Sequence, residues 1–135
     1  PRTTPPPPYV LAMVICDAIY KDPMTGKRTL LGCFAGITGL QFPIVHPMMA
    51  VYAAATDGRG THEIRLRLVD VNEARPVLFE ATGEVEFESP RTIVEMDFFL
   101  PQVRIDEPGE YRLQLFAGQD PLMERRFVVY DGSTQ

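Results

Sequence analysis

Two cysteines and two histidines are the side chains of this 135-residue chain best suited to nucleophilic, redox or metal chemistry. We expect a four-residue loop, Pro23–Gly26, to close the first hairpin, so that Asp22 pairs with Lys27. Counting outward then places Cys16 opposite Cys33. Facing residues have Cβ atoms about 4.5–5.5 Å apart, whereas a disulfide requires about 3.8 Å. The pair is therefore either a labile redox pair or, as we expect, two small buried apolar side chains.

The histidines lie far apart in the predicted topology. His46 lies in a constrained segment between Pro43 and Pro47, and His62 begins an alternating strand at the other end. The chain has no Gly-framed nucleophile turn, no His-Glu-x-x-His helix and no Gly-rich phosphate loop. We expect structural histidines, no metal, no cofactor and no enzymatic activity, with a hydrolase or metal enzyme as the third hypothesis.

Oxygen ligands gather in two loops that a sandwich would bring to one end. Such hard ligands hold calcium in several β-sandwich modules. Their spacing matches no defined calcium loop, so solvated loop charges are the favoured interpretation. The residues concerned are Asp70, Asn72, Glu73, Asp106 and Glu107.

The apolar pattern predicts an all-β scaffold for these residues. Between His62 and Leu68, apolar and charged side chains alternate strictly, which is typical of a half-buried strand. No window shows a sustained helical period, and turn signals recur at regular spacing. We predict an antiparallel β-sandwich, immunoglobulin-like in style. Its eight strands are expected near residues 9–21, 27–38, 48–56, 62–70, 77–88, 92–100, 110–117 and 122–130.

Tyr111 is a candidate structural corner. It follows Pro108 and Gly109 at the start of an alternating strand. In immunoglobulin-like sandwiches, a tyrosine at such a place donates its hydroxyl to a preceding loop. The alternative is an ordinary hairpin with Tyr111 in the core.

Two early segments, residues 9–16 and 48–55, are apolar on both faces. A strand in a two-layer sandwich needs one apolar face, so the second face requires a cover. We expect a structural or interaction subunit that forms a homo-oligomer or binds another protein. A Pro-rich arm, residues 1–8, precedes the single sandwich domain, residues 9–135, and would cover part of the surplus face. The expected interface residues are Pro5, Pro6, Pro7, Pro8, Tyr9, Leu11, Met13, Ile15, Met49, Val51 and Tyr52.

An acidic outer face is predicted for the fifth and sixth strands. The solvated interpretation is favoured over a docking surface for a basic partner, because Arg65, Arg67 and Arg112 are expected to neutralise part of the charge. The acidic residues are Glu80, Glu84, Glu86, Glu88, Glu95 and Asp97.

The net charge of −5 disfavours nucleic acid and anionic membrane surfaces as partners. No apolar run reaches the length of a membrane span, and the first residues lack a signal-peptide pattern. We expect a cytoplasmic protein whose initiator methionine has been removed; two cysteines suit a reducing compartment.

A second functional hypothesis is a small-ligand or carbohydrate-binding module that uses the end loops. The chain lacks tryptophan, the usual sugar platform, although tyrosine can replace it. The residues proposed for this site are Tyr20, Asp57, Arg59, His62 and Tyr130.

Several segments together resemble an uncharacterised family of small bacterial proteins that carries a domain-of-unknown-function label. The resemblance covers nearly everything after the Pro-rich arm and implies a cytoplasmic β protein, with no activity or ligand to transfer. The segments are residues 10–17, 25–27, 30–34, 42–47, 50–52, 108–111 and 124–127.

Overall fold

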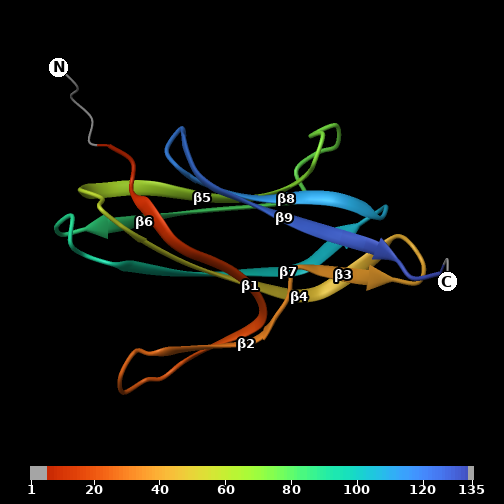
Figure 1. Ribbon diagram of the computed structural model, residues 1–135, viewed down its shortest axis with the longest axis horizontal. Helices are drawn as coiled ribbons and strands as arrows, with labels where there is room; N and C mark the ends of the chain where they lie inside the picture. The colour runs from red at the N-terminus through yellow and green to blue at the C-terminus, as the bar shows by residue number, and fades with distance from the viewer. Residues whose placement is uncertain (1–5, 134–135) are drawn as a thin grey trace.

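The computed structural model describes residues 6–133, which form nine strands and no helix, arranged as two sheets packed face to face (Figure 1). Sheet A has the order β2-β1-β4-β7, and sheet B has the order β3-β9-β8-β5-β6. All paired strands are antiparallel except β3 and β9, which are parallel. The prediction of an all-β sandwich is therefore confirmed. The strands of sheet A are β1 (Tyr9–Lys21), β2 (Arg28–Cys33), β4 (Ile44–Thr56) and β7 (Val94–Ile105). Those of sheet B are β3 (Gly36–Gly39), β5 (Gly60–Asp70), β6 (Phe79–Phe87), β8 (Gly109–Ala117) and β9 (Asp120–Asp131).

The segment predicted as one strand over residues 27–38 is two strands, β2 and β3, that belong to different sheets. The chain crosses between the sheets at Phe34, whose ring lies 6.2 Å from the ring of Phe127. Apolar periodicity runs through this crossing without a break, so the expected count of eight strands was one too low.

The core lies between the two inner faces. Ile64, Leu66 and Leu68 of β5 are buried there, as their alternation predicts. Leu113 and Leu115 of β8 continue the same layer. These side chains pack against the inward face of β1, β4 and β7, which fixes which of the two apolar faces of sheet A is internal.

Tyr111 forms the predicted corner. Its ring is buried, and its hydroxyl donates a 2.6 Å hydrogen bond to the backbone carbonyl of Glu107 in the preceding loop. The bond ties the entry of β8 to the loop that follows β7, as expected where a chain passes from one sheet to the other.

The first hairpin leaves the plane of sheet A. β1 pairs with β4 from Tyr9 to Cys16, and from Ala18 to Lys21 it pairs only with β2. The hairpin formed by residues 17–32, called the flap below, lies on the side of sheet A away from sheet B (Figure 1). The predicted loop is present, because the amide of Asp22 donates to the carbonyl of Lys27 at 2.8 Å.

Among the described residues, both sheets have an edge on the same side of the molecule that is only partly paired. β3 covers β9 only from Val128 to Asp131, and the first half of β1 pairs only with β4. Arg125 of β9 spans the gap and donates a 2.6 Å hydrogen bond to the carbonyl of Met13. This bond occupies an edge group that another chain would otherwise find free. Within residues 6–133, no helix is long and apolar enough to cross a membrane.

Candidate interaction surface

The outer face of sheet A carries short rows of mainly apolar residues that run across the strands, two of which end in a carboxylate of β7. One row joins Cys16, Ala50 and Phe99, and Cys33 of β2 extends it. The neighbouring rows are Val14, Tyr52 and Asp97, and Ala12, Ala54 and Glu95. The two strands that are apolar on both faces, β1 and β4, are therefore neighbours, and their surplus faces merge into one surface.

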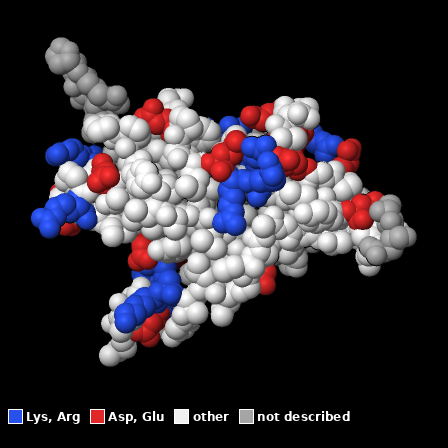
Figure 2. All heavy atoms as spheres, viewed as in Figure 1, with Lys and Arg blue, Asp and Glu red and all other residues white. Residues whose placement is uncertain are grey.

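The outer face of sheet B is chemically different. Glu110 receives ion pairs from Arg112 at 2.5 Å and from Arg126 at 3.2 Å, and Arg112 also reaches Glu124 at 2.8 Å. Arg65 lies over the ring of Phe116, with 4.6 Å between its guanidinium carbon and the ring centroid. This face is a network of paired charges, typical of a solvated surface. Figure 2 views the molecule along the edge that contains β1 and β9, where uncharged atoms separate groups of charged side chains.

Four of the expected interface residues lie elsewhere. Met13, Ile15, Met49 and Val51 are buried between the sheets, where they pack against sheet B. The prediction was wrong for these four because a strand that is apolar on both faces does not reveal which face is inward. A register shift between Val10 and Ala12 also reverses the alternation of β1.

Of the remaining expected residues that the structure describes, all except Pro8 have exposed surface. Tyr9 and Leu11 are exposed at the start of β1, and Tyr52 is half-buried on the outer face. Pro6 and Pro7 are exposed and Pro8 is buried, whereas Pro5 lies outside the described residues.

Met48 and Phe99 are exposed apolar side chains that the sequence analysis missed. They are 44% and 52% exposed, enough to contribute apolar area to an interface. Their sequence neighbours Met49 and Leu100 point inward and are buried, so Met48 and Phe99 point to the outer face. The alternation of apolar and polar residues along residues 94–100 could have predicted that Phe99 points outward.

The flap covers one part of the outer face and is held there by a charged clamp. Arg28 of β2 donates from Nε to Asp97 at 2.8 Å and from Nη1 to Glu95 at 2.9 Å. Its guanidinium carbon lies 5.9 Å from the ring centroid of Tyr52. The Arg28 side chain is only 12% exposed, so the flap shields this end of the face.

The surroundings of Tyr52 raise the pKa of its hydroxyl. Tyr52 donates a short hydrogen bond from its hydroxyl to Glu95. Burial, followed by the hydrogen bond and the charge of Glu95, raises the pKa of Tyr52 to about 12. The phenol is therefore neutral and acts as a donor at physiological pH.

The predicted cysteine register is confirmed, because Cys16 and Cys33 are paired across β1 and β2. Cys16 is buried, but Cys33 is exposed. The expectation of two buried apolar side chains is therefore wrong for Cys33.

The two histidines lie on different strands with different neighbours. The ring of His46 lies tilted at 5.9 Å from the ring of Phe34, and His62 makes an edge contact at 5.7 Å with Phe87. His62 also lies 3.1 Å from the carbonyl of Arg59. Within residues 6–133, no group of three or more His, Cys, Asp or Glu side chains is arranged to hold a metal ion.

The two acidic loops converge as expected, but an arginine lies between them. Arg75 donates to Glu107 at 2.6 Å and lies 3.9 Å from Asp70. Its guanidinium provides the positive charge that a calcium ion would bring. The favoured interpretation of these residues as loop charges therefore fits the structure better than a calcium site.

The end-loop residues of the ligand-binding hypothesis do not form one site. Asp57, Arg59 and His62 surround the start of β5, whereas Tyr130 ends β9. Because β9 and β5 both pair antiparallel with β8, their directions agree and these two positions lie at opposite ends of sheet B.

The predicted acidic outer face is divided between the two sheets. Glu80 of β6 pairs with Arg65 at 3.5 Å on sheet B, whereas Glu95 and Asp97 of β7 bind Arg28 on sheet A. The sequence analysis grouped them because β6 and β7 are consecutive, but the chain changes sheets between them.

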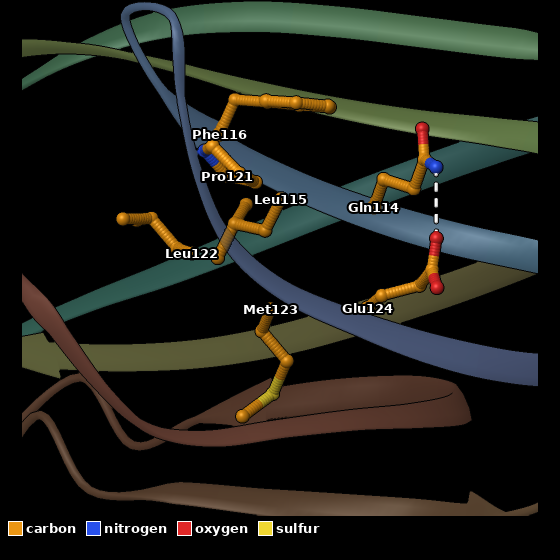
Figure 3. A pocket seen from close by; sticks show the side chains of 7 residues that line it. All are labelled: Gln114, Leu115, Phe116, Pro121, Leu122, Met123 and Glu124. Carbon is orange, nitrogen blue, oxygen red and sulfur yellow. Dashed lines mark hydrogen bonds between the residues drawn. The ribbon is translucent and has the colours of Figure 1, made fainter.

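A shallow hollow of about 280 Å³ lies beside the β8–β9 hairpin (Figure 3). Its polar groups include Gln114 and Glu124, which bind each other at 2.9 Å. Its other walls are Leu115, Phe116, Pro121, Leu122 and Met123. Apart from the Gln114–Glu124 pair, the hollow offers mainly apolar contact.

Comparison with known proteins identifies the family alone. No curated protein matches the sequence. Among solved structures, the chain is similar to a β-glucosidase from Listeria innocua, determined in complex with isofagomine, at 15% identity and a TM-score of 0.41. The match covers 91% of this chain and 17% of that chain, and it carries no functional argument. A family described as being of unknown function, DUF6941, matches residues 11–130, in agreement with the resemblance to an uncharacterised family. This chain therefore belongs to the DUF6941 family.

Proposed function

We propose that this protein is a non-enzymatic interaction subunit that associates with a second copy of itself through the outer face of sheet A, assisted by the Pro-rich arm. The observation that carries the proposal is the contrast between the two outer faces. Sheet B presents paired charges, whereas sheet A presents apolar rows in which Met48 and Phe99 are 44% and 52% exposed. Met48 and Phe99 lie on neighbouring strands of the same face, and grouped exposed apolar side chains are typical of an interaction site.

The flap limits the size of any interface, because it already shields the outer face of sheet A around Tyr52. In the row that ends in Phe99, Cys16 and Ala50 are fully buried, and of these three residues only Phe99 is exposed. Tyr9 and Leu11 at the start of β1 are exposed as well, and the buried Pro8 separates them from the exposed Pro6 and Pro7. The surface left for a partner is therefore the area around Met48 and Phe99 on one side of the clamp, and the start of β1 on the other side.

A second copy fits this surface because two such faces can pack as the inner faces of a sandwich do. The charges nearest the apolar rows, Glu95 and Asp97, are already paired with Arg28 within one chain. Facing copies would therefore not bring unpaired carboxylates together. A two-fold arrangement uses the same patch on both partners and closes the assembly as a dimer.

Light scattering and native mass spectrometry over a range of concentrations test the proposal. We expect a dimer whose dissociation constant rises at least about tenfold in Phe99→Asp, because central apolar contacts dominate interfaces. Leu40→Asp is the matched control, since Leu40 is 71% exposed but lies in the loop between β3 and β4. Deletion of residues 1–8 should also reduce oligomer size or solubility. A soluble monomer at every concentration would contradict the proposal.

A further inference from the structure

Cys16 and Cys33 face each other where the flap leaves sheet A. Beside them, the amide of Phe34 donates a 3.0 Å hydrogen bond to the carbonyl of Ile15. In an antiparallel ladder, hydrogen-bonded and non-hydrogen-bonded residue pairs alternate. Because Ile15 and Phe34 are hydrogen-bonded to each other, their neighbours Cys16 and Cys33 form a non-hydrogen-bonded pair. Such pairs have Cα atoms about 4.5 Å apart, within the range of about 4.4–6.8 Å that disulfides require.

The two thiols differ in access, and neither belongs to the core between the sheets. Cys16 has no exposed surface but lies on the outer face of sheet A, beneath the base of the flap. Cys33 is exposed. Packing explains a buried Cys16, but it gives no reason for a cysteine at the exposed position directly opposite.

A small reagent can reach Cys33. A shallow hollow of about 270 Å³ borders it and is also lined by Asp17, Gly32, Phe34 and His46. Burial, and then the negative charge of a Cys33 thiolate, raise the pKa of Cys16 above its ordinary value. Accessibility therefore assigns the first reaction to Cys33 and the second to Cys16.

We propose that Cys16 and Cys33 form a reversible disulfide, made by exchange with a low-molecular-weight disulfide, that fastens the base of the flap. The Cys33 thiolate attacks one sulfur of the small disulfide, forms a mixed disulfide and releases one small thiolate. Cys16 then loses its proton and attacks the Cys33 sulfur, which releases the second small thiolate, and that leaving group takes up a proton. Two protein thiols are oxidised and one small disulfide is reduced to two thiols.

The disulfide would add a covalent link to a segment that makes few contacts with the rest of the protein. Along the flap, Tyr20, Met24 and Leu31 are all exposed, and Arg28 clamps it to the sheet. Fastening residues 16 and 33 limits how far β2 can move when the clamp opens. In a reducing compartment the bond would be transient, as is usual for regulatory disulfides.

The test uses the full chain incubated with oxidised glutathione, followed by thiol alkylation and peptide mapping under non-reducing conditions. We expect both free thiols to disappear, the mass to fall by two hydrogen atoms, and the two cysteine-containing peptides to be joined within one chain. Reduced glutathione should restore both thiols. Hydrogen exchange of the β2 amides should slow in the oxidised form, a structural readout that does not depend on self-association.

Two variants distinguish the roles of the thiols. Cys16→Ala should stop at the mixed disulfide on Cys33, and Cys33→Ala should remain unmodified because Cys16 is buried. The proposal is overturned if the unaltered chain keeps glutathione on Cys33 as its final product, retains both thiols in excess oxidant, or forms only disulfide-linked dimers. Mapping of the unaltered chain decides the question even where a variant folds poorly.

Discussion

Arg28 and Asp97 are 69 positions apart in the sequence, yet the Arg28 Nε–H donates a 2.8 Å hydrogen bond to the Asp97 carboxylate. The contact joins β2 to β7, the two edge strands of sheet A. It exists because β1 bends away from β4 after Cys16 and carries β2 over the outer face.

Arg28→Gln should lower the free energy of unfolding by about 1–3 kcal/mol, because partly buried carboxylates lose a charged donor. Urea unfolding measures the loss, and hydrogen exchange should show faster exchange in β2. Arg104→Gln is the control, since the side chains of Arg104 and Asp106 are 65% and 60% exposed. An exposed pair contributes at most about 1 kcal/mol. Equal effects of the two substitutions would show that the clamp does not hold the flap.

Alkaline pH should lower the free energy of unfolding, because Tyr52 loses its proton there. Its pKa is raised from 10.0 to about 12 in the folded chain, so the folded state holds the proton more tightly than the unfolded state. The contribution is fully present below pH 10.0, falls between pH 10.0 and about 12, and is lost above that. Unfolding measured across this range should lose less stability in Tyr52→Phe than in the unaltered chain. A parallel loss in both proteins would exclude Tyr52 as the source.

Tyr111→Phe should destabilise the sandwich by about 1–2 kcal/mol, because the carbonyl of Glu107 loses its hydroxyl donor while the ring is retained. Tyr130→Phe is the matched change at a tyrosine that is 58% exposed. It should alter the free energy of unfolding by less than about 0.5 kcal/mol. Thermal and urea unfolding of both variants check the difference. An unchanged free energy of unfolding in Tyr111→Phe would show that the corner hydrogen bond does not stabilise the sandwich.

Gly36→Ala should destabilise the pairing of β3 with β9. A Cβ at Gly36 would lie 2.3 Å from the carbonyl oxygen of Val128, a backbone atom that cannot move aside without displacing a strand. A cost of about 1–3 kcal/mol is expected for such overpacking. Gly83→Ala in β6 is the control, because a Cβ there meets nothing within 4 Å. That change should stabilise the protein by about 0.4–1 kcal/mol. Urea unfolding of both variants should give opposite signs.

Local chemistry predicted several features correctly. The strict alternation around Leu66 placed its side chain in the core. The loop at Pro23–Gly26 fixed the register of the first hairpin, and with it the facing positions of Cys16 and Cys33. The Pro-Gly turn before Tyr111 predicted its corner hydrogen bond. Each of these depends on residues close together in the sequence, whose geometry a turn or a two-residue period determines.

Other features required the tertiary structure. Met13 and Met49 could not be assigned to the core by sequence, because their strands are apolar on both faces and only the position of sheet B selects the inner one. Glu80 and Glu95 were predicted to share one acidic face, but they lie on different sheets because the chain changes sheets between β6 and β7. The clamp at Arg28 arises from a bend in β1 that no periodicity records. The sequence alone thus determined strands, turns and hairpin register, which are local, whereas burial and charge pairing were decided by packing between distant strands.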